Sequence, residues 1–243
     1  MKRSVSYLSF TALFVALALT LSSLFHTLEK AILPSSSVKG EGLERVIIID
    51  AGHGGMDGGA TGTTGVLEKH INLEISRMLA DLLRGAGYCV VETRTDDRLL
   101  GEDQAIKGHK KQADLSARLA LSDAYPDSIF ISIHMNSYQG VSCHGLQVWY
   151  SQNNSESKEW AQAIQQGVKA RLQPENNRKI KAATSSIYLL RHAKNPAILI
   201  ECGFLSTEEE CERLSTPDYQ HQLALTLFGA IGEKMQDEAC AKK

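Results

Sequence analysis

Hydrophobic positions along the chain fall into two patterns, short apolar runs and longer stretches with an apolar residue every three or four positions. The apolar runs predict strands at Arg45–Asp50, Tyr88–Thr93, Ser128–His134, Leu146–Tyr150, Pro196–Cys202 and, more briefly, near Ile187–Leu190. The helical spacing predicts helices at Leu67–Arg84, Ala113–Ala124, Ser155–Leu172, Thr207–Leu214 and Pro217–Met235. Because strands alternate with helices, we expect one α/β domain with a mostly parallel sheet covered on both faces.

The amino terminus departs from this pattern. Met1-Lys2-Arg3 is basic, and the following stretch Ser4–Phe25 carries no charge. Such a run can span a bilayer as a helix, or it can be a signal peptide cleaved near Ala16-Leu17-Ala18. We therefore expect export. The predicted organisation is a signal or membrane-anchor segment at 1–27, a linker at 28–44, the catalytic domain at 45–236 and a C-terminal tail at 237–243.

Composition and charge exclude several classes of protein. The 243 residues are 43% apolar and 22% charged with a formal charge of -2, which is ordinary for a globular protein. The basic clusters Lys107–Lys111 and Arg178–Lys181 are short and lack interleaved aromatics, so no nucleic-acid partner is expected. An odd number of scattered cysteines without a C-x-x-C pair excludes a zinc ribbon and does not suggest a disulfide framework: Cys89, Cys143, Cys202, Cys211 and Cys240.

Four polar side chains fall where functional groups collect in such sheets, just beyond the carboxyl ends of strands. His53 follows the first strand in a glycine-rich loop, Glu68 begins the first helix, His134 ends the third strand and Glu201 ends the last. Two imidazoles and a carboxylate form an open zinc site, which leaves a coordination position for water. We expect His53, Glu68 and His134 to bind Zn²⁺. Glu201 then takes the proton from water and delivers it to a leaving nitrogen.

Other interpretations of these residues are weaker. A lone histidine at a strand end is more often structural, and the loop Gly52–Gly65 matches neither phosphate-binding glycine motif. H-E-x-x-H and G-x-S-x-G are absent. Cys202 is a candidate nucleophile, but its apolar strand favours an inert thiol. His70, close to Glu68, is the one substitute metal ligand among the other histidines.

Four motifs in this order resemble those of the zinc-dependent N-acetylmuramoyl-L-alanine amidases: Asp50-Ala51-Gly52-His53-Gly54-Gly55, Leu67-Glu68-Lys69, Ser132-Ile133-His134-Met135-Asn136 and Glu201-Cys202-Gly203-Phe204-Leu205-Ser206. The resemblance extends from about Arg45 to Met235. It implies a twisted, mostly parallel six-stranded sheet with helices on both faces. It also implies the same roles, zinc binding by His53, Glu68 and His134 and catalysis by Glu201. Thr207 stands where the family usually has Asn, and we expect it to cap the following helix.

Within this family the chain looks most like the germination-specific amidases of spore-forming bacteria, the CwlD type. The similar features are a bare domain behind a hydrophobic segment, the basic insert Ile106–Lys111, and Arg178-Lys179 ahead of Ile187–Leu190. The resemblance implies removal of stem peptides from muramic acid in the spore cortex, so that muramic-δ-lactam forms together with a separate deacetylase. Without a wall-binding repeat, recruitment to peptidoglycan falls to the membrane segment, the substrate or a partner protein.

Three alternatives remain open on sequence alone. A vegetative wall-remodelling amidase would share every catalytic residue. A zinc peptidase or deacetylase could use the same ligands, and a non-catalytic wall-binding protein could retain the fold. The polar loops Arg94–Gln112 and Ser151–Ser155 are candidates for the wall of a glycan groove.

Overall fold

The computed structural model describes residues 45–101, 103, 108–138, 140 and 142–241. The predicted signal or anchor segment at 1–27 and the linker at 28–44 lie outside these residues. Across the described ranges, none of the helices is both long and apolar enough to cross a membrane.

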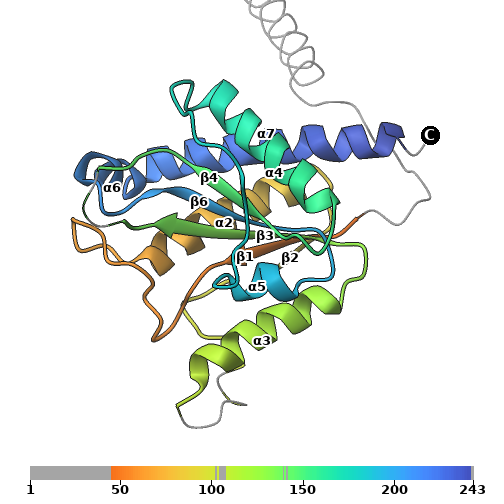
Figure 1. Cartoon of the computed structure of the whole chain (residues 1–243), viewed down its shortest axis with the longest axis horizontal. Helices are drawn as coiled ribbons and strands as arrows, with labels where there is room; N and C mark the ends of the chain where they lie inside the picture. Colours follow the sequence, from red (N-terminus) through yellow and green to blue (C-terminus); the bar gives the residue numbers. More distant parts are fainter. Residues whose placement is uncertain (1–44, 102, 104–107, 139, 141, 242–243) are drawn as a thin grey trace, which may run out of the picture. The chain divides into compact units, whose positions relative to one another are not determined.

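Six strands form one sheet (Figure 1), and their bounds are β1 Ile47–Ala51, β2 Val90–Glu92, β3 Ile129–Asn136, β4 Gln147–Tyr150, β5 Lys181–Ala182 and β6 Ala197–Phe204. The strand order is β2-β1-β3-β6-β4-β5. The β1–β2, β1–β3, β3–β6 and β4–β5 pairs are parallel, whereas β4 runs antiparallel to β6. The predicted mostly parallel six-stranded sheet is confirmed.

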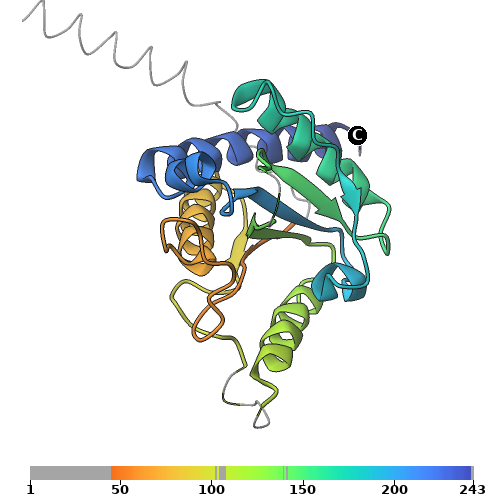
Figure 2. The ribbon, with the colours of Figure 1, turned by 60° about the vertical axis from the view of Figure 1, so that its left-hand side comes forward.

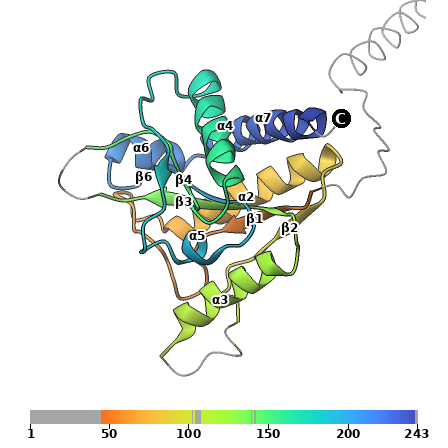
Figure 3. The ribbon, with the colours of Figure 1, turned by 45° about the vertical axis from the view of Figure 1, so that its right-hand side comes forward.

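Helices cover both faces of this sheet, and their bounds are α2 Glu68–Gly85, α3 Lys110–Asp123, α4 Glu156–Arg171, α5 Tyr188–His192, α6 Glu208–Leu214 and α7 Pro217–Ala241. Helices α2, α4 and α7 pack together over one face, while α3 and α5 lie on the other. Figures 2 and 3 show the same separation from two further directions.

One predicted strand is wrong. The apolar residues near Ile187–Leu190 form the helix α5, and the sixth strand is instead the two-residue β5. Leu189 and Leu190 are buried against the α3 side of the sheet, which a single helical turn achieves as well as a strand does. A strand as short and polar as Lys181–Ala182 leaves no apolar run to recognise. Sequence pattern alone could not separate these two assignments.

The last helix also extends beyond its predicted end at Met235 and reaches Ala241. No glycine or proline follows Met235 to stop it, and ion pairs hold its last turns. Glu238 contacts Lys234 on its own helix at 3.6 Å and Arg45, just before β1, at 2.9 Å.

The two faces of the sheet differ in how far apolar packing extends. The larger core, beneath α2, α4 and α7, includes Ile49, Ile131 and Ile200. The smaller core, beneath α3 and α5, includes Phe130 and Leu199. Side chains alternate between faces along a strand. On the smaller-core face, the carboxyl-terminal halves of the strands therefore carry polar residues instead: Asp50, Ser132, His134 and Glu201.

Candidate metal and catalytic site

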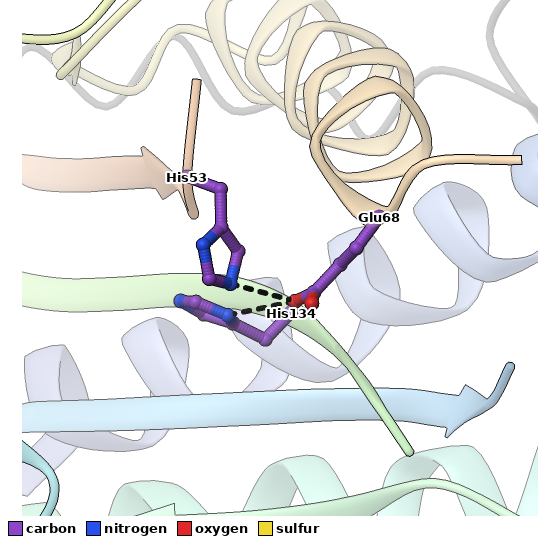
Figure 4. A group of neighbouring side chains, drawn as sticks. All are labelled: His53, Glu68 and His134. Carbon is purple, nitrogen blue, oxygen red and sulfur yellow. Dashed lines mark hydrogen bonds and ion pairs between the residues drawn. The ribbon is translucent and has the colours of Figure 1, made fainter. Parts of the chain in front are cut away.

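Three of the four predicted site residues converge at the carboxyl end of the sheet. His53 lies in the loop after β1, Glu68 is the first residue of α2, and His134 lies near the end of β3. Figure 4 shows both imidazoles directed at the Glu68 carboxylate. His53 Nε2 is 3.2 Å from Glu68 Oε1, and His134 Nδ1 is 2.9 Å from the same oxygen. One ligand atom from each residue lies within 4.8 Å of the other two, so the group can hold a metal ion.

Glu68 is held in position from several sides. Its Oε1 accepts hydrogen bonds from the Met135 amide at 3.0 Å and Asn72 Nδ2 at 3.3 Å, and its Oε2 accepts one from the Ala60 amide at 2.9 Å. Burial works to raise the pKa of Glu68, but hydrogen bonds and charge from His134 and His53 outweigh it and hold that pKa well below its usual range. The carboxyl is therefore an anion at neutral pH.

His53 owes its orientation to Asp57, which the sequence analysis missed. Asp57 Oδ2 lies 3.0 Å from His53 Nδ1, on the side of the ring opposite Glu68. This contact leaves Nε2 directed into the site, as outer carboxylates do for metal-binding histidines. Burial lowers the pKa of His53, but Glu68 and Asp57 together raise it. In the sequence, the one indication of this role was that Asp57 is an acidic residue four positions after His53 in the same glycine-rich loop.

Two glycines make room for these side chains. A Cβ at Gly52 would lie 2.3 Å from Cε1 and Nε2 of His134. At Gly59, where φ is +67°, a Cβ would lie 2.5 Å from Glu68 Oε2 and 2.8 Å from His53 Cδ2. Real Cβ atoms do not approach so closely, so the packing of the site requires glycine at both positions.

Glu201 lies beside this cluster on the neighbouring strand. It is the register partner of His134 in the β3–β6 pair, so both side chains emerge on the same face about 4.8 Å apart along the sheet. Its Oε2 is buried and has no hydrogen-bond partner among the described residues. Burial raises the pKa of Glu201 to about 7; the charge of His134 opposes that rise and the charge of Glu68 adds to it. A buried acceptor without a partner is suited to receive a proton.

Two buried arginines hold the loop that carries His53, and neither was predicted as a site residue. Arg118, from α3, donates to the carbonyl oxygens of Ala51 at 2.8 Å and His53 at 2.7 Å. Arg94, after β2, donates to the carbonyls of Ala51 and Gly52, each at 2.9 Å. For Arg118, the one indication was that a charged residue faces inward from the predicted helix Ala113–Ala124.

Comparison with known proteins agrees with this geometry. The profile of the N-acetylmuramoyl-L-alanine amidase family, Amidase_3, matches residues 47–233. The chain belongs to this family. The predicted enzyme class, N-acetylmuramoyl-L-alanine amidase, is thereby confirmed.

Similar proteins include amidases of spore-forming bacteria, as predicted. The germination-specific N-acetylmuramoyl-L-alanine amidase of Bacillus subtilis is 34% identical over 189 residues, which cover 77% of this chain and 78% of that protein. The CwlD amidase from Clostridioides difficile, solved in complex with the GerS lipoprotein, is 36% identical with a TM-score of 0.74, covering 79% of this chain and 98% of that one. The amidase LytC of Bacillus subtilis is 28% identical, over 78% of this chain and 35% of LytC.

The remaining candidates of this amidase lie outside the cluster. His70 is exposed, 3.7 Å from Asp97, and does not belong to the metal-binding group. Cys202 is fully buried, and burial raises the pKa of its thiol, which disfavours a nucleophile. The expectation that Thr207 caps α6 through its side chain is wrong. Its hydroxyl donates instead to the carbonyl of Cys143 at 2.6 Å, which ties the loop before β4 to the end of β6.

Proposed function

We propose that this amidase hydrolyses the bond between N-acetylmuramic acid and L-alanine in peptidoglycan, with Zn²⁺ held by His53, Glu68 and His134 and with Glu201 as the proton carrier. The convergence of those three side chains beside an unpaired buried oxygen of Glu201 carries the proposal. Two imidazole nitrogens and one carboxylate oxygen are a donor set found in catalytic zinc sites. When bound, Zn²⁺ supplies Lewis-acid chemistry, which polarises a carbonyl and makes water a stronger acid.

The chain's own residues then have separate tasks. Glu201 accepts a proton from the attacking water and gives it to the departing amine of L-alanine, as the C–N bond breaks and a C–O bond forms. Without a metal, burial raises the pKa of Glu201 to about 7, and a nearby cation lowers it, which favours the base form that accepts the proton from water. Asp57 and the arginines Arg94 and Arg118 keep the His53 loop in place.

The variant Glu201→Gln tests the role of the proton carrier. It should retain zinc, measured by elemental analysis of the purified protein, while release of stem peptide from peptidoglycan falls about 10²–10⁴-fold. Glu208→Gln, at an exposed position on α6, is the matched control and should keep full turnover. Near-normal turnover by Glu201→Gln would remove Glu201 from the mechanism.

The zinc assignment has its own test. His134→Ala should lose bound zinc and turnover together, whereas His192→Ala, an exposed histidine on α5, should lose neither. A protein that binds no zinc, or whose activity survives exhaustive chelation, would contradict the assignment.

Product analysis separates this amidase reaction from its alternatives. An amidase leaves an intact glycan strand and releases peptides with a new N-terminal alanine, which mass spectrometry detects. A zinc peptidase would cut within the stem peptide, and a deacetylase would release acetate. A wall-binding protein without activity would release nothing.

We further propose a role in the spore cortex, outside the cytoplasmic membrane. The likeness to a germination-specific amidase supports it. The likeness to an amidase solved in complex with a lipoprotein supports recruitment by a partner protein, and the uncharged stretch Ser4–Phe25 supports export with a retained or cleaved anchor. Loss of the gene should leave cortex without muramic-δ-lactam and vegetative wall unchanged. The opposite pattern would favour a vegetative role, such as the similarity to LytC suggests.

A further inference from the structure

A row of aligned residues leads across the sheet from the candidate site toward its far edge. Glu201 on β6 pairs in register with His134 on one side and with Gln147, the first residue of β4, on the other. Directly opposed residues present their side chains on the same face. Because β4 is antiparallel, its beginning lies at the same end of the sheet as the ends of β3 and β6. Gln147 is therefore the neighbour of Glu201 on the side away from the metal-binding group.

Gln147 is buried and fixes an arginine beside the site. Its Nε2 donates to the carbonyl of Lys179 at 2.8 Å, which leaves its Oε1 to accept a hydrogen bond from Arg178 Nη1 at 3.1 Å. Arg178 Nε donates to the carbonyl of His144 at 2.8 Å, and its guanidinium lies 4.4 Å from the centre of the Phe204 ring. Three contacts from different segments thus hold one partly exposed guanidinium over the end of β6.

This guanidinium lacks an anionic partner. Within the described part of the chain, no aspartate or glutamate forms an ion pair with Arg178, and its Nη2 has no hydrogen-bond partner. The arginines Arg94 and Arg118 are instead fully committed to backbone carbonyls and buried carboxylates. A guanidinium that is already oriented loses little entropy on binding a carboxylate, which it can engage through charge-assisted hydrogen bonds.

Building on the proposed function, we propose that Arg178 binds a carboxylate of the stem peptide and so selects acidic stem peptides over amidated ones. Strands are about 4.8 Å apart, which places the region around Gln147 and Arg178 about 5–10 Å from Glu201. An extended peptide advances about 3.3–3.6 Å per residue. The carboxylate therefore belongs to one of the residues that follow the alanine at the scissile bond.

The test compares three substrates, each a glycan strand with uniform stem peptides. One carries free carboxylates throughout, one is amidated at the α-carboxylate of the second residue, and one at the free carboxylate of the third. The unmodified amidase should lose about tenfold or more in kcat/KM on one of the amidated substrates, which identifies the carboxylate. Arg178→Gln should lose a similar factor on the acidic substrate and no longer distinguish the three.

Lys181→Gln is the matched control. Lys181 is a neighbouring exposed cation whose Nζ lies 5.1 Å from the centre of the Trp149 ring. The side chain of Gln147 instead bonds to the Lys179 carbonyl and to Arg178. Lys181→Gln should keep the preference of the unmodified amidase, and Arg178→Lys should restore part of it. Comparing substrates on one variant cancels any general weakening of the fold. If Arg178→Gln lowers kcat/KM equally on all three, or if the unmodified amidase does not discriminate, Arg178 has no part in selection.

A binding measurement keeps this proposal distinct from the proposed reaction. Calorimetry on Glu201→Gln measures affinity for the acidic and amidated strands without turnover. The carboxylate preference should persist there and disappear in the double variant with Arg178→Gln. If the acidic strand binds preferentially but the unmodified amidase does not hydrolyse it, the proposed reaction is refuted and the role of Arg178 is supported. If hydrolysis occurs without preferential binding, the reaction is supported and the role of Arg178 is refuted.

Discussion

Replacing Arg118 by methionine tests whether the buried charges beneath the site are balanced as the structure indicates. Arg118 is 1% exposed and contacts two buried carboxylates, Asp50 and Asp114. Asp50 is completely buried and also accepts hydrogen bonds from the hydroxyls of Ser132 and Thr93. Methionine keeps much of the volume of the side chain but removes the positive charge and its donors.

The expected cost follows from leaving anions without a counter-charge. Removing one partner of a buried ion pair typically destabilises a protein by about 3–5 kcal/mol, because the remaining charge stays desolvated. For a domain of this size, that loss lowers Tm by about 6–20 °C. Because total stability is about 5–15 kcal/mol, this loss removes a large part of it, so Arg118→Met should unfold at a markedly lower urea concentration.

The stability difference between Arg118→Met and the unmodified protein should depend on pH, because it depends on the charge of Asp50. Burial favours a raised pKa for Asp50, but Arg118 and the Ser132 and Thr93 hydroxyls outweigh it and hold that pKa below the usual value. In the unmodified protein, Asp50 therefore contributes stability at neutral pH that is lost as pH falls through its depressed pKa. Without Arg118, burial prevails and the pKa of Asp50 rises. Protonation then relieves the uncompensated charge, so the gap between variant and unmodified protein narrows toward acid pH.

Urea unfolding between pH 5 and 8, followed by circular dichroism, measures this gap. Adding Asp50→Asn to Arg118→Met should recover part of the lost stability at pH 7, because one unpaired anion is gone. A destabilisation below about 1 kcal/mol, well short of the range for a broken buried pair, would refute the reasoning. So would a gap that neither pH nor Asp50→Asn changes.

Three further predictions concern the site itself. Gly52→Ala places a methyl group against the His134 ring and should lower turnover roughly 100-fold, measured as peptide release, because a displacement of about 1 Å is enough for such a loss. Asp57→Asn should weaken zinc binding about 10–100-fold in chelator competition, because His53 loses the carboxylate that orients it. The Glu201 carboxyl of the metal-free protein should titrate near pH 7 by carbon NMR, and zinc should lower that value because a cation favours the charged form; a metal-free value below 5 would contradict its burial. Controls for the two substitutions are Gly85→Ala, with nothing near its added methyl, and the exposed Asp81→Asn.

The convergence of His53, Glu68 and His134 was predictable because of how parallel sheets are built. His53 and His134 end or follow strands that run in the same direction, so the apolar runs alone place them at one edge. Glu68 could be added because it begins the helix that follows the glycine-rich loop, so it lies next to the loop that carries His53. The short strand β5 could not be predicted, because a two-residue pairing at the edge of a sheet leaves no hydrophobic pattern.

The residues that support the site were invisible for a different reason. Asp57, Arg94 and Arg118 act through contacts with backbone carbonyls or with the far nitrogen of an imidazole. Such contacts depend on the path of a loop, and a loop of many glycines has no periodicity from which its path can be inferred. The residues that converge at the candidate site were therefore predictable from the sequence, whereas the residues that hold them in place were not.

Gln147 and Arg178 lie outside the rule that places functional residues just after the carboxyl ends of strands. That rule looks for function after a strand, since in a parallel sheet only the carboxyl ends meet at the site. Strand β4 is reversed relative to β6, so the residue that reaches the site is its first, and the arginine that contacts it comes from a loop much later in the chain. One antiparallel strand in a parallel sheet thus brings a strand beginning into the same row as His134 and Glu201. If Arg178 proves to select the substrate, the reversal of β4 is what places chemistry and selectivity on one face.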